Sequence, residues 1–239
     1  MPPSRYLRQI KLLGNNANSK LQQLTVGIVG CGGLGSNSAA LCAQIGVKRL
    51  ILMDRDRVSR TDFSRQQYFE QDLGKPKVEA LKDRIARINP ETRVDVQFDQ
   101  FGTTSSPLFE TANIILDGTD NYSARVLINR FSLKKRIPWV FASALKFEGM
   151  LSTILPGKSA CFECWAKKPI NELSCEDSGI MNTAVGVISA LQVQELVSLA
   201  CFNGPNYLDN LIRVDLSRGL FEKIALVRET DCKACSKTR

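Results

Sequence analysis

The sequence predicts an α/β fold in which a doubly wound parallel sheet is extended by antiparallel strands towards the C-terminus. First, short apolar runs alternate with helical patterns over residues 24–142. Second, a glycine-rich turn separates the first apolar run from the first helical pattern. Third, residues 147–155 and 208–227 have strand patterns that lack this alternation with helices. These last strands are expected to complete the sheet.

The individual elements follow a polar opening segment. The predicted strands are short β-rich or apolar runs, at residues 24–29, 49–53, 93–98, 113–116 and 139–142. The predicted helices contain small residues or apolar residues at helical spacing, at residues 36–45, 75–88 and 123–135. Asp54 and Asp117 follow directly after two of the strands. Strands that alternate with helices in this way are typical of a Rossmann-like sheet.

Length and composition are those of one soluble globular domain, which we expect to span residues 1–239. The chain has 239 residues, of which 44% are hydrophobic and 23% are charged. These fractions are near the averages for globular proteins and argue against disordered, collagen-like and coiled-coil classes. A single core suffices, because cores stop growing only near roughly 250–300 residues.

The charged residues restrict the chemistry and suggest the partner. The chain has no histidine, which excludes Ser/His and Cys/His nucleophile pairs, histidine metal ligands and a histidine general base. Its net charge of +8 favours an anionic partner, such as a nucleotide, an acidic protein or a nucleic acid.

No apolar run is long enough to predict a membrane span. The longest apolar helical stretch, residues 179–202, is interrupted by Asn182, Gln192, Gln194 and Glu195. The N-terminus is basic and polar and lacks the apolar region of a secretory signal. We therefore expect a cytoplasmic protein with reduced cysteines and no membrane partner.

The glycine-rich turn predicts a nucleotide site. Gly30, Gly32 and Gly35 satisfy the G-x-G-x-x-G pattern between a strand and a helix, where backbone amides can approach a phosphate. Asp54, at the end of the next strand, could accept hydrogen bonds from two ribose hydroxyls. An adenosine nucleotide is the leading ligand. A tight turn without a ligand and an NAD-dependent oxidoreductase remain alternatives.

Two C-x-x-C pairs predict a metal site. Cys161 and Cys164 form one pair, and Cys232 and Cys235 form the other. Four thiolates in two such pairs suggest a tetrahedral, structural Zn²⁺ that fixes the C-terminus to the domain. Two redox pairs or four unrelated thiols are the alternatives.

Several further motifs occur in order along the chain. They are RYLRQI at 5–10, Asp54-Arg55-Asp56, Arg65-Gln66, GKPK at 74–77, INP at 88–90 and DGTDN at 117–121. Together with the glycine-rich turn, they resemble the ubiquitin-activating-enzyme-like adenylyltransferases of the ThiF/MoeB/HesA group. The resemblance extends from about Arg5 to Cys235, nearly the whole chain.

The resemblance implies an ATP- and Mg²⁺-dependent adenylyltransferase. Its substrate would be the C-terminal glycine carboxylate of a ubiquitin-fold sulfur-carrier protein ending in Gly-Gly, with release of pyrophosphate, in thiamine, molybdopterin or related synthesis. Residues 20–142 would then be the nucleotide-binding half, and 143–239 the carrier-binding and zinc-containing half. Residues expected beside the nucleotide are Gly32, Gly33, Gly35, Asp54, Asp56 and Asp62.

The resemblance also implies a reaction centre. Arg65 and Lys77 would neutralise charge on the transferring phosphorus and on pyrophosphate, and Asp120 would hold Mg²⁺. Lys75 is near Lys77, but the position within GKPK favours Lys77. Arg8 would act on the ATP of the partner subunit in a homodimer. A glycine carboxylate is already ionised at neutral pH, so the absence of histidine is compatible with this chemistry.

Two positions leave questions open. Asp62 stands where the family usually has asparagine, and a carboxylate there would repel ATP unless Mg²⁺ or an arginine offsets it. Cys175 occupies the family's crossover-loop cysteine, which in some relatives takes the activated acyl group or a persulfide, whereas in others the adenylate is the product. The alternatives of a tRNA-modifying dehydratase and an inactive ubiquitin-fold binding module also remain, although no nucleic-acid partner is expected.

Overall fold

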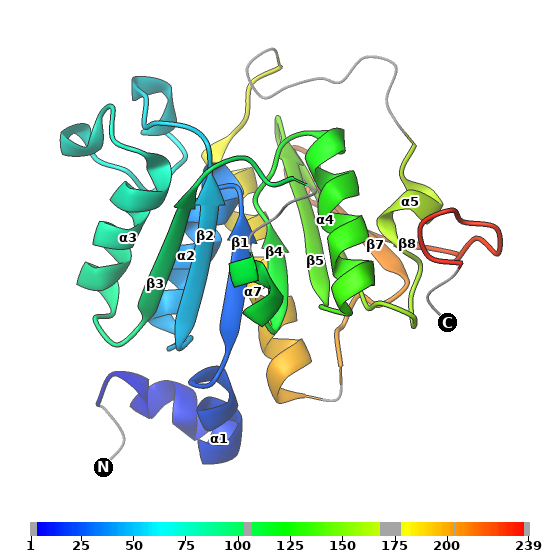
Figure 1. Ribbon diagram of the computed structural model, residues 1–239, viewed down its shortest axis with the longest axis horizontal. Helices are drawn as coiled ribbons and strands as arrows, with labels where there is room; N and C mark the ends of the chain where they lie inside the picture. The colour runs from blue at the N-terminus through cyan, green and yellow to red at the C-terminus, as the bar shows by residue number, and fades with distance from the viewer. Residues whose placement is uncertain (1–3, 103–106, 168–177, 203, 237–239) are drawn as a thin grey trace.

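The computed structural model describes residues 4–102, 107–167, 178–202 and 204–236. Their strands form an eight-stranded sheet in the order β3-β2-β1-β4-β5-β6-β7-β8 (Figure 1). Pairing is parallel from β3 to β5 and antiparallel from β5 to β8. The predicted fold class, a parallel core extended by antiparallel strands, is confirmed.

The strands agree closely with the expected ranges. They are β1 (Thr25–Val29), β2 (Arg49–Asp54), β3 (Arg93–Phe98), β4 (Ile114–Asp117), β5 (Trp139–Leu145), β6 (Glu148–Ile154), β7 (Asn210–Asp215) and β8 (Leu220–Ala225). The α-helices are α1 (Leu7–Leu21), α2 (Gly33–Gln44), α3 (Lys77–Ile88), α4 (Tyr122–Lys135), α5 (Phe162–Trp165) and α7 (Asn182–Cys201). Short 3₁₀ helices are η1 (Ser4–Tyr6), η2 (Arg60–Asp62), η3 (Glu70–Asp72) and η4 (Pro107–Thr111).

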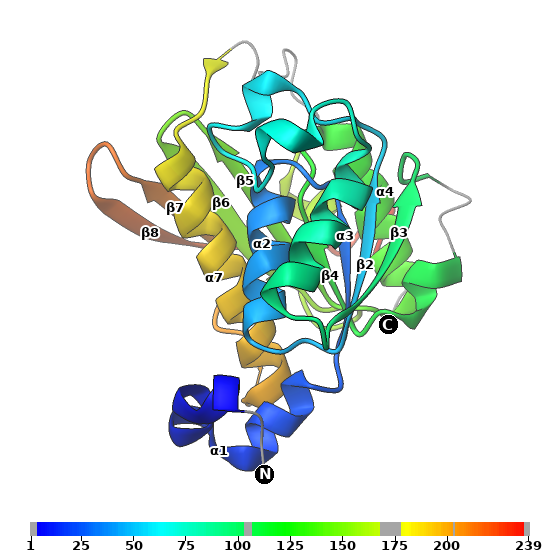
Figure 2. The ribbon, with the colours of Figure 1, turned by 90° about the vertical axis from the view of Figure 1, so that its left-hand side faces the viewer.

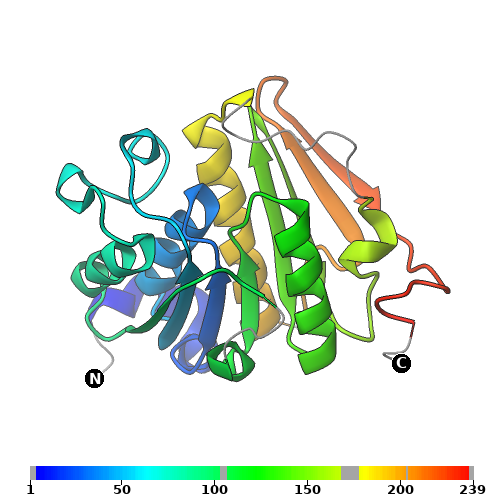
Figure 3. The ribbon, with the colours of Figure 1, turned by 45° about the horizontal axis from the view of Figure 1, so that its top comes forward.

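Helices cover both faces of the parallel strands. Figure 2 shows α3, α2 and α7 side by side over one face, and Figure 3 shows α4 over the other. Side chains alternate between the faces: Leu50 and Leu52 of β2 belong to the cluster under α2 and α7, whereas Ile51 and Met53 belong to the cluster under α4. This period of two is expected for a strand buried on both faces.

The strand order reverses direction at β1. The chain leaves β1 for β2 on one side and later returns to β4 on the other side. In doubly wound sheets, ligands bind outside the carboxyl ends of the strands at such a reversal. The loops that follow β1, β2 and β4 therefore form the region where the site is expected.

The polar opening segment is helical, which its sequence pattern does not predict. α1 has a break at Gly14, where φ is 80°. Tertiary contacts hold the segment, because Tyr6 is buried and its hydroxyl accepts a hydrogen bond from Asn89 Nδ2 at 2.8 Å. These contacts join the RYLRQI and INP motifs, which are far apart in sequence.

α7 is long and apolar enough to cross a membrane by length and composition, with a mean hydropathy of 1.6. Its polar residues nevertheless bond to the domain. Gln192 donates to the carbonyl oxygens of Asp117 and Val140 at 2.9 and 3.0 Å, and Glu195 accepts from Thr153 Oγ1 at 2.7 Å. These are the contacts of a core helix in a soluble domain.

Candidate functional site

The glycine-rich turn closes only because it lacks side chains. Gly30 has φ of 87°, a conformation that favours glycine. A Cβ atom on Gly35 would lie 1.8 Å from the carbonyl oxygen of Gly30, and one on Gly30 would lie 2.6 Å from the carbonyl oxygen of Gly118. The turn thereby brings the start of α2 against the loop that follows β4.

The N-terminus of α2 is open to an anion. Gly32 is its N-cap, and no side chain caps the helix. A Cβ atom on Gly32 would meet nothing within 4 Å. The amides of a first helical turn and the helix dipole attract phosphate. Gly32 and Gly33 thus offer backbone to a ligand, whereas Gly35 permits the close packing of the turn.

Asp54 lies at the carboxyl end of β2, beside this turn. Its two oxygens accept hydrogen bonds from the amides of Cys31 and Asp56, at 2.6 and 2.7 Å. Burial raises the pKa of Asp54, although these two amides and Lys77 act in the opposite direction. The carboxylate is thus held rigidly, and its remaining lone pairs can accept ribose hydroxyls.

The segment after η2 is fastened to α2 by residues that the motifs did not identify. Asn37 Nδ2 donates to the carbonyl oxygens of Gly33 and Arg65, at 2.8 and 3.1 Å. Gln67 Nε2 donates to Asn37 Oδ1 at 2.7 Å, and the Tyr68 hydroxyl donates to the carbonyl oxygen of Cys31 at 2.7 Å. Polar side chains in the first turns of α2 are the sequence signal that could have identified this contact.

Arg65 and Lys77 both bond to the segment that joins β2 to α3. Arg65 Nη1 donates to the carbonyl oxygen of Thr61 at 2.5 Å. The Lys77 amide donates to the carbonyl oxygen of Asp56 at 2.9 Å, which fixes the first residue of α3 against the loop after β2. Lys77 Nζ lies 3.6 Å from Asp56 Oδ2. Lys77 also acts on Asp54, because burial raises the pKa of that carboxyl and Lys77 lowers it.

Asp62 joins these two cations. Its side chain is buried, and Oδ1 lies 3.7 Å from Lys77 Nζ and 3.9 Å from Arg65 Nη2. The negative charge expected to repel ATP is thus offset by an arginine and a lysine.

The loop after β4 contains one buried and one exposed carboxylate. Asp117 is fully buried, accepts from the Thr119 amide at 2.8 Å, and lies 3.3 Å from Arg125 Nε. Burial raises the pKa of Asp117, and Arg125 opposes this effect. Asp120 is exposed, and its Oδ1 accepts from Asn121 Nδ2 at 3.2 Å. Asp117 therefore stabilises the loop, while Asp120 is accessible to a ligand.

Arg8 is not brought to this region, and the expected Cys175 cannot be placed. Arg8 is exposed on α1, which precedes the amino end of β1 and lies at the opposite end of the sheet from η2 and η3 (Figure 1). Cys175 lies outside the described residues.

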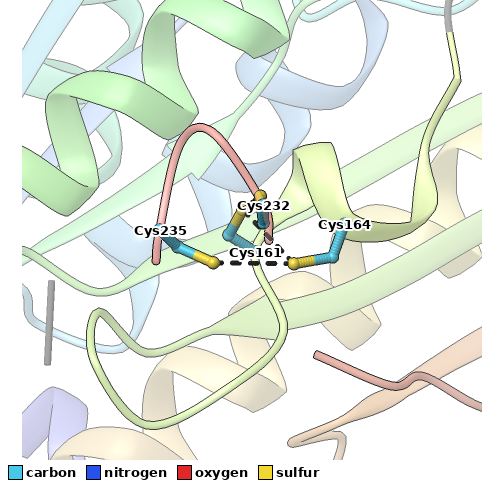
Figure 4. Close-up of side chains that lie close together, drawn as sticks. All are labelled: Cys161, Cys164, Cys232 and Cys235. Carbon is cyan, nitrogen blue, oxygen red and sulfur yellow. Dashed lines mark hydrogen bonds between the residues drawn. The ribbon is translucent and has the colours of Figure 1, made fainter. Parts of the chain in front are cut away.

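The four cysteines of the two C-x-x-C pairs form a buried cluster (Figure 4). Their Sγ atoms all lie within 4.8 Å of one another, and three pairs are 3.6–3.7 Å apart. A disulfide would need about 2.05 Å. Four thiolates at about 2.3 Å from a tetrahedral Zn²⁺ would be about 3.8 Å apart. The donors and their spacing fit zinc.

Polar side chains surround the cysteine cluster. Asn129 Nδ2 donates to Cys161 Sγ at 3.6 Å and to Glu163 Oε1 at 3.1 Å. Arg228 Nη2 donates to the carbonyl oxygen of Cys235 at 2.8 Å. Such outer contacts orient metal ligands. Asn129 could not be identified from the cysteine spacing, because it lies far from all four cysteines in sequence.

The sequence comparisons agree with one another over nearly the whole chain. The sequence profile of the ThiF family matches residues 6–236. The chain is 32% identical to the molybdopterin-synthase adenylyltransferase of Salmonella typhimurium, covering 98% of this chain and 96% of that protein. It is 35% identical to the adenylyltransferase and sulfurtransferase MOCS3 of Sus scrofa, covering 98% of this chain but only 53% of that protein. The chain thus spans about half of the two-activity relative.

Solved structures show the same fold. Escherichia coli MccB, in a crystal structure with ATP, has a TM-score of 0.85 and 22% identity, covering 99% of this chain and 75% of that chain. PaaA has a TM-score of 0.77 and 21% identity, covering 93% and 82%. At these identities the likeness concerns the fold alone.

Proposed function

The chain belongs to the ThiF family, and on that premise we propose that it adenylates the C-terminal glycine carboxylate of a ubiquitin-fold sulfur-carrier protein with ATP. The observation that carries this proposal is the convergence of Arg65 and Lys77 beside Asp54 and the open N-terminus of α2. The full-length match to a molybdopterin-synthase adenylyltransferase supports the same activity.

The proposed reaction needs positioning and charge more than proton transfer. A carboxylate oxygen of the carrier's terminal glycine attacks the α-phosphorus, and the bond from that phosphorus to the β-bridging oxygen breaks. Pyrophosphate leaves with the electron pair, and an acyl adenylate forms. The α2 amides hold phosphate oxygens, Asp54 holds the ribose, and Arg65 and Lys77 neutralise the charge that develops on the leaving group.

The residues also fit a magnesium ion. Asp120 is an exposed carboxylate at the carboxyl edge of β4, and carboxylate and phosphate oxygens are the donors that Mg²⁺ prefers. When bound, Mg²⁺ supplies positive charge to the triphosphate. Within this chain, Asp120 is the residue proposed to hold it, while the buried Asp117 maintains the loop.

A homodimer would explain the position of Arg8. In its own chain, Arg8 is at the far end of the sheet from the proposed ATP site, so it can act only on a second subunit. We therefore propose that each site combines Arg65, Lys77 and Asp120 of one chain with Arg8 of its partner.

The remaining parts of the proposal concern the partner and the later steps. The antiparallel half, residues 143–239, would bind the carrier, and Zn²⁺ at the four cysteines would be structural. We place the reaction in the cytoplasm, where thiols stay reduced.

Transfer of the acyl group to Cys175 is a separate hypothesis. Cys175→Ser should leave pyrophosphate exchange intact and block only a later sulfur step.

The test is pyrophosphate exchange into ATP with Mg²⁺, with and without a panel of carrier proteins ending in Gly-Gly. We expect exchange only with a matching carrier, and its loss in Asp120→Ala. ATP binding without exchange would favour the tRNA-modifying dehydratase or the inactive binding module. Binding of NADH but not ATP would favour the oxidoreductase.

A further inference from the structure

Asp62 is a buried carboxylate within ion-pair distance of two cations, and its environment shows what the charge can do. The side chain is 5% exposed. Oδ2 accepts from the amide and the hydroxyl of Ser59, at 2.8 and 3.0 Å. Oδ1 accepts from Gln66 Nε2 at 2.6 Å. Both oxygens are thus fixed by neutral donors before any cation is considered.

The same Oδ1 also lies within ion-pair distance of two cations from different segments. Lys77 Nζ, on α3, is 3.7 Å away, and Arg65 Nη2, after η2, is 3.9 Å away. The Lys77 side chain is only 9% exposed, so water screens the pair weakly. A neutral amide at position 62 would not attract either cation in this way.

The charge of Asp62 has two opposite consequences for ATP. It restrains two long side chains, each of which otherwise loses rotamer freedom when a ligand orders it. It also adds a negative charge beside the expected triphosphate, which weakens the binding of ATP. The restraint favours the transition state, where the two cations must be in place, and the repulsion disfavours bound ATP.

We propose that Asp62 is a positioning residue that holds Lys77 and Arg65 in their reacting orientation and that its charge lowers the affinity for ATP while it raises the adenylation rate. This proposal rests on the proposed function. It predicts a split between binding and catalysis that a purely structural aspartate would not produce.

Asp72 provides a matched control. It is the last residue of η3, as Asp62 is of η2, and it is also buried. Its Oδ2 accepts from the Phe69 amide at 3.1 Å, and its Oδ1 accepts from Lys75 Nζ at 3.1 Å. Asp72 therefore has the same local role and a lysine partner, but that lysine is outside the proposed reaction centre.

Asp62→Asn is expected to fold. The replacement keeps one oxygen, which can accept from Ser59. Its new N–H donor also has a possible acceptor, because Gln66 Oε1 is buried without a hydrogen-bond partner in the described part of the chain. Rotation of the Gln66 amide can bring that oxygen towards the new donor. Thermal unfolding of both aspartate variants checks this expectation.

The experiment compares wild type, Asp62→Asn and Asp72→Asn by calorimetric binding of Mg²⁺-ATP and by carrier-dependent pyrophosphate exchange. For Asp62→Asn, we expect the Kd for ATP to fall about three- to tenfold and kcat to fall about tenfold or more. For Asp72→Asn, both should stay within about twofold of wild type.

Several results would overturn the proposal. Unchanged or increased kcat in Asp62→Asn would show that its charge does not position the cations, and weaker ATP binding would show that its charge does not oppose ATP. If Asp72→Asn also lowered both the Kd for ATP and kcat, the effect would be general to buried aspartates at the ends of η2 and η3 and not specific to Asp62. If the wild-type protein shows no pyrophosphate exchange with any carrier, the proposed function itself fails. This result needs no variant and is therefore distinct from a failure of the Asp62 proposal.

Discussion

Lys75 and Lys77 of the GKPK run have different surroundings although one residue separates them. The Lys75 side chain is 45% exposed and pairs with Asp72. The Lys77 side chain is 9% exposed and lies between Asp56 and Asp62. Sequence position alone favoured Lys77 as the reacting lysine, and burial next to the expected phosphate site gives that choice a physical basis.

Replacement of each lysine by alanine separates their roles. Lys77→Ala should lower the rate of pyrophosphate exchange about 10²- to 10³-fold, because one cation is lost from the transition state. Lys75→Ala should change the rate less than about threefold, because exposed ion pairs contribute little. The measurement is the rate of pyrophosphate exchange in each variant, after circular dichroism has shown that both variants are folded as the wild type is. Equal losses would remove Lys77 from the reaction centre.

At the scale of elements, α1 depends on a residue far away in sequence. Asn89, which caps the end of α3, is buried. Its Nδ2 donates to Tyr6 Oη and to the carbonyl oxygen of Ala43, both at 2.8 Å, and its Oδ1 accepts from Arg5 Nη1 at 2.7 Å. The side-chain amide of Asn89 thus attaches the N-terminal segment, which contains Arg8, to the end of α2 and to α3.

Asn89→Ala should loosen α1 without altering the loops around Asp54. The variant leaves buried polar partners unsatisfied, so we expect the free energy of unfolding to fall by about 1–3 kcal/mol. Proteolytic cleavage before residue 21 should become faster. Urea denaturation and timed proteolysis measure the two effects, with Asn16→Ala on the exposed side of α1 as the control. Unchanged proteolysis would show that other contacts hold α1.

At the scale of the whole molecule, the cysteine cluster joins the end of the described chain to the sheet. Cys161 and Cys164 lie at α5, which packs with Trp139 and Phe141 of β5, and Cys232 and Cys235 lie beyond β8. A metal bound to these cysteines would close a long loop of the chain and so lower the conformational entropy of the unfolded state. We expect little effect on the proposed ATP site, which none of the four cysteines lines.

Zinc removal should therefore affect stability more than chemistry. We expect about one zinc per chain by elemental analysis. Loss of the metal in Cys232→Ser should lower Tm by several degrees, since about 1 kcal/mol corresponds to about 2–4 °C at this chain length. The rate of pyrophosphate exchange in Cys232→Ser, measured at low temperature, should stay within about threefold of the wild-type rate. Cys201→Ser, outside the cluster, should keep its zinc. Full zinc content in Cys232→Ser would contradict the four-thiolate site.

The proposed homodimer allows two inactive variants to complement each other. Arg8→Ala and Lys77→Ala should each be nearly inactive alone. Subunits that exchange in a mixture form heterodimers in which one of two sites has both native residues, so about one quarter of wild-type exchange should return. No recovery after demonstrated subunit exchange would exclude the action of Arg8 on the partner's site.

Local patterns in the sequence predict the order of the elements along the chain, the glycine-rich turn and the cysteine set. These patterns are short apolar runs for the strands, helical spacing in 75–88, glycines that the turn requires sterically, and C-x-x-C pairs. β3 and the start of β2 coincide with their expected residues, because both strands are encoded by residues that are adjacent in sequence.

Which side chains meet depends on the three-dimensional fold. The polar pattern of α1 does not predict a helix, because that helix depends on packing and on Asn89. The joining of Arg65 and Lys77 by Asp62 could not be read from the motifs, since an ion pair depends on distance and burial rather than on spacing in sequence. The sequence leaves open whether Mg²⁺ or an arginine offsets the charge of Asp62, and the fold places an arginine and a lysine beside it because the loop after β2 folds back onto α3.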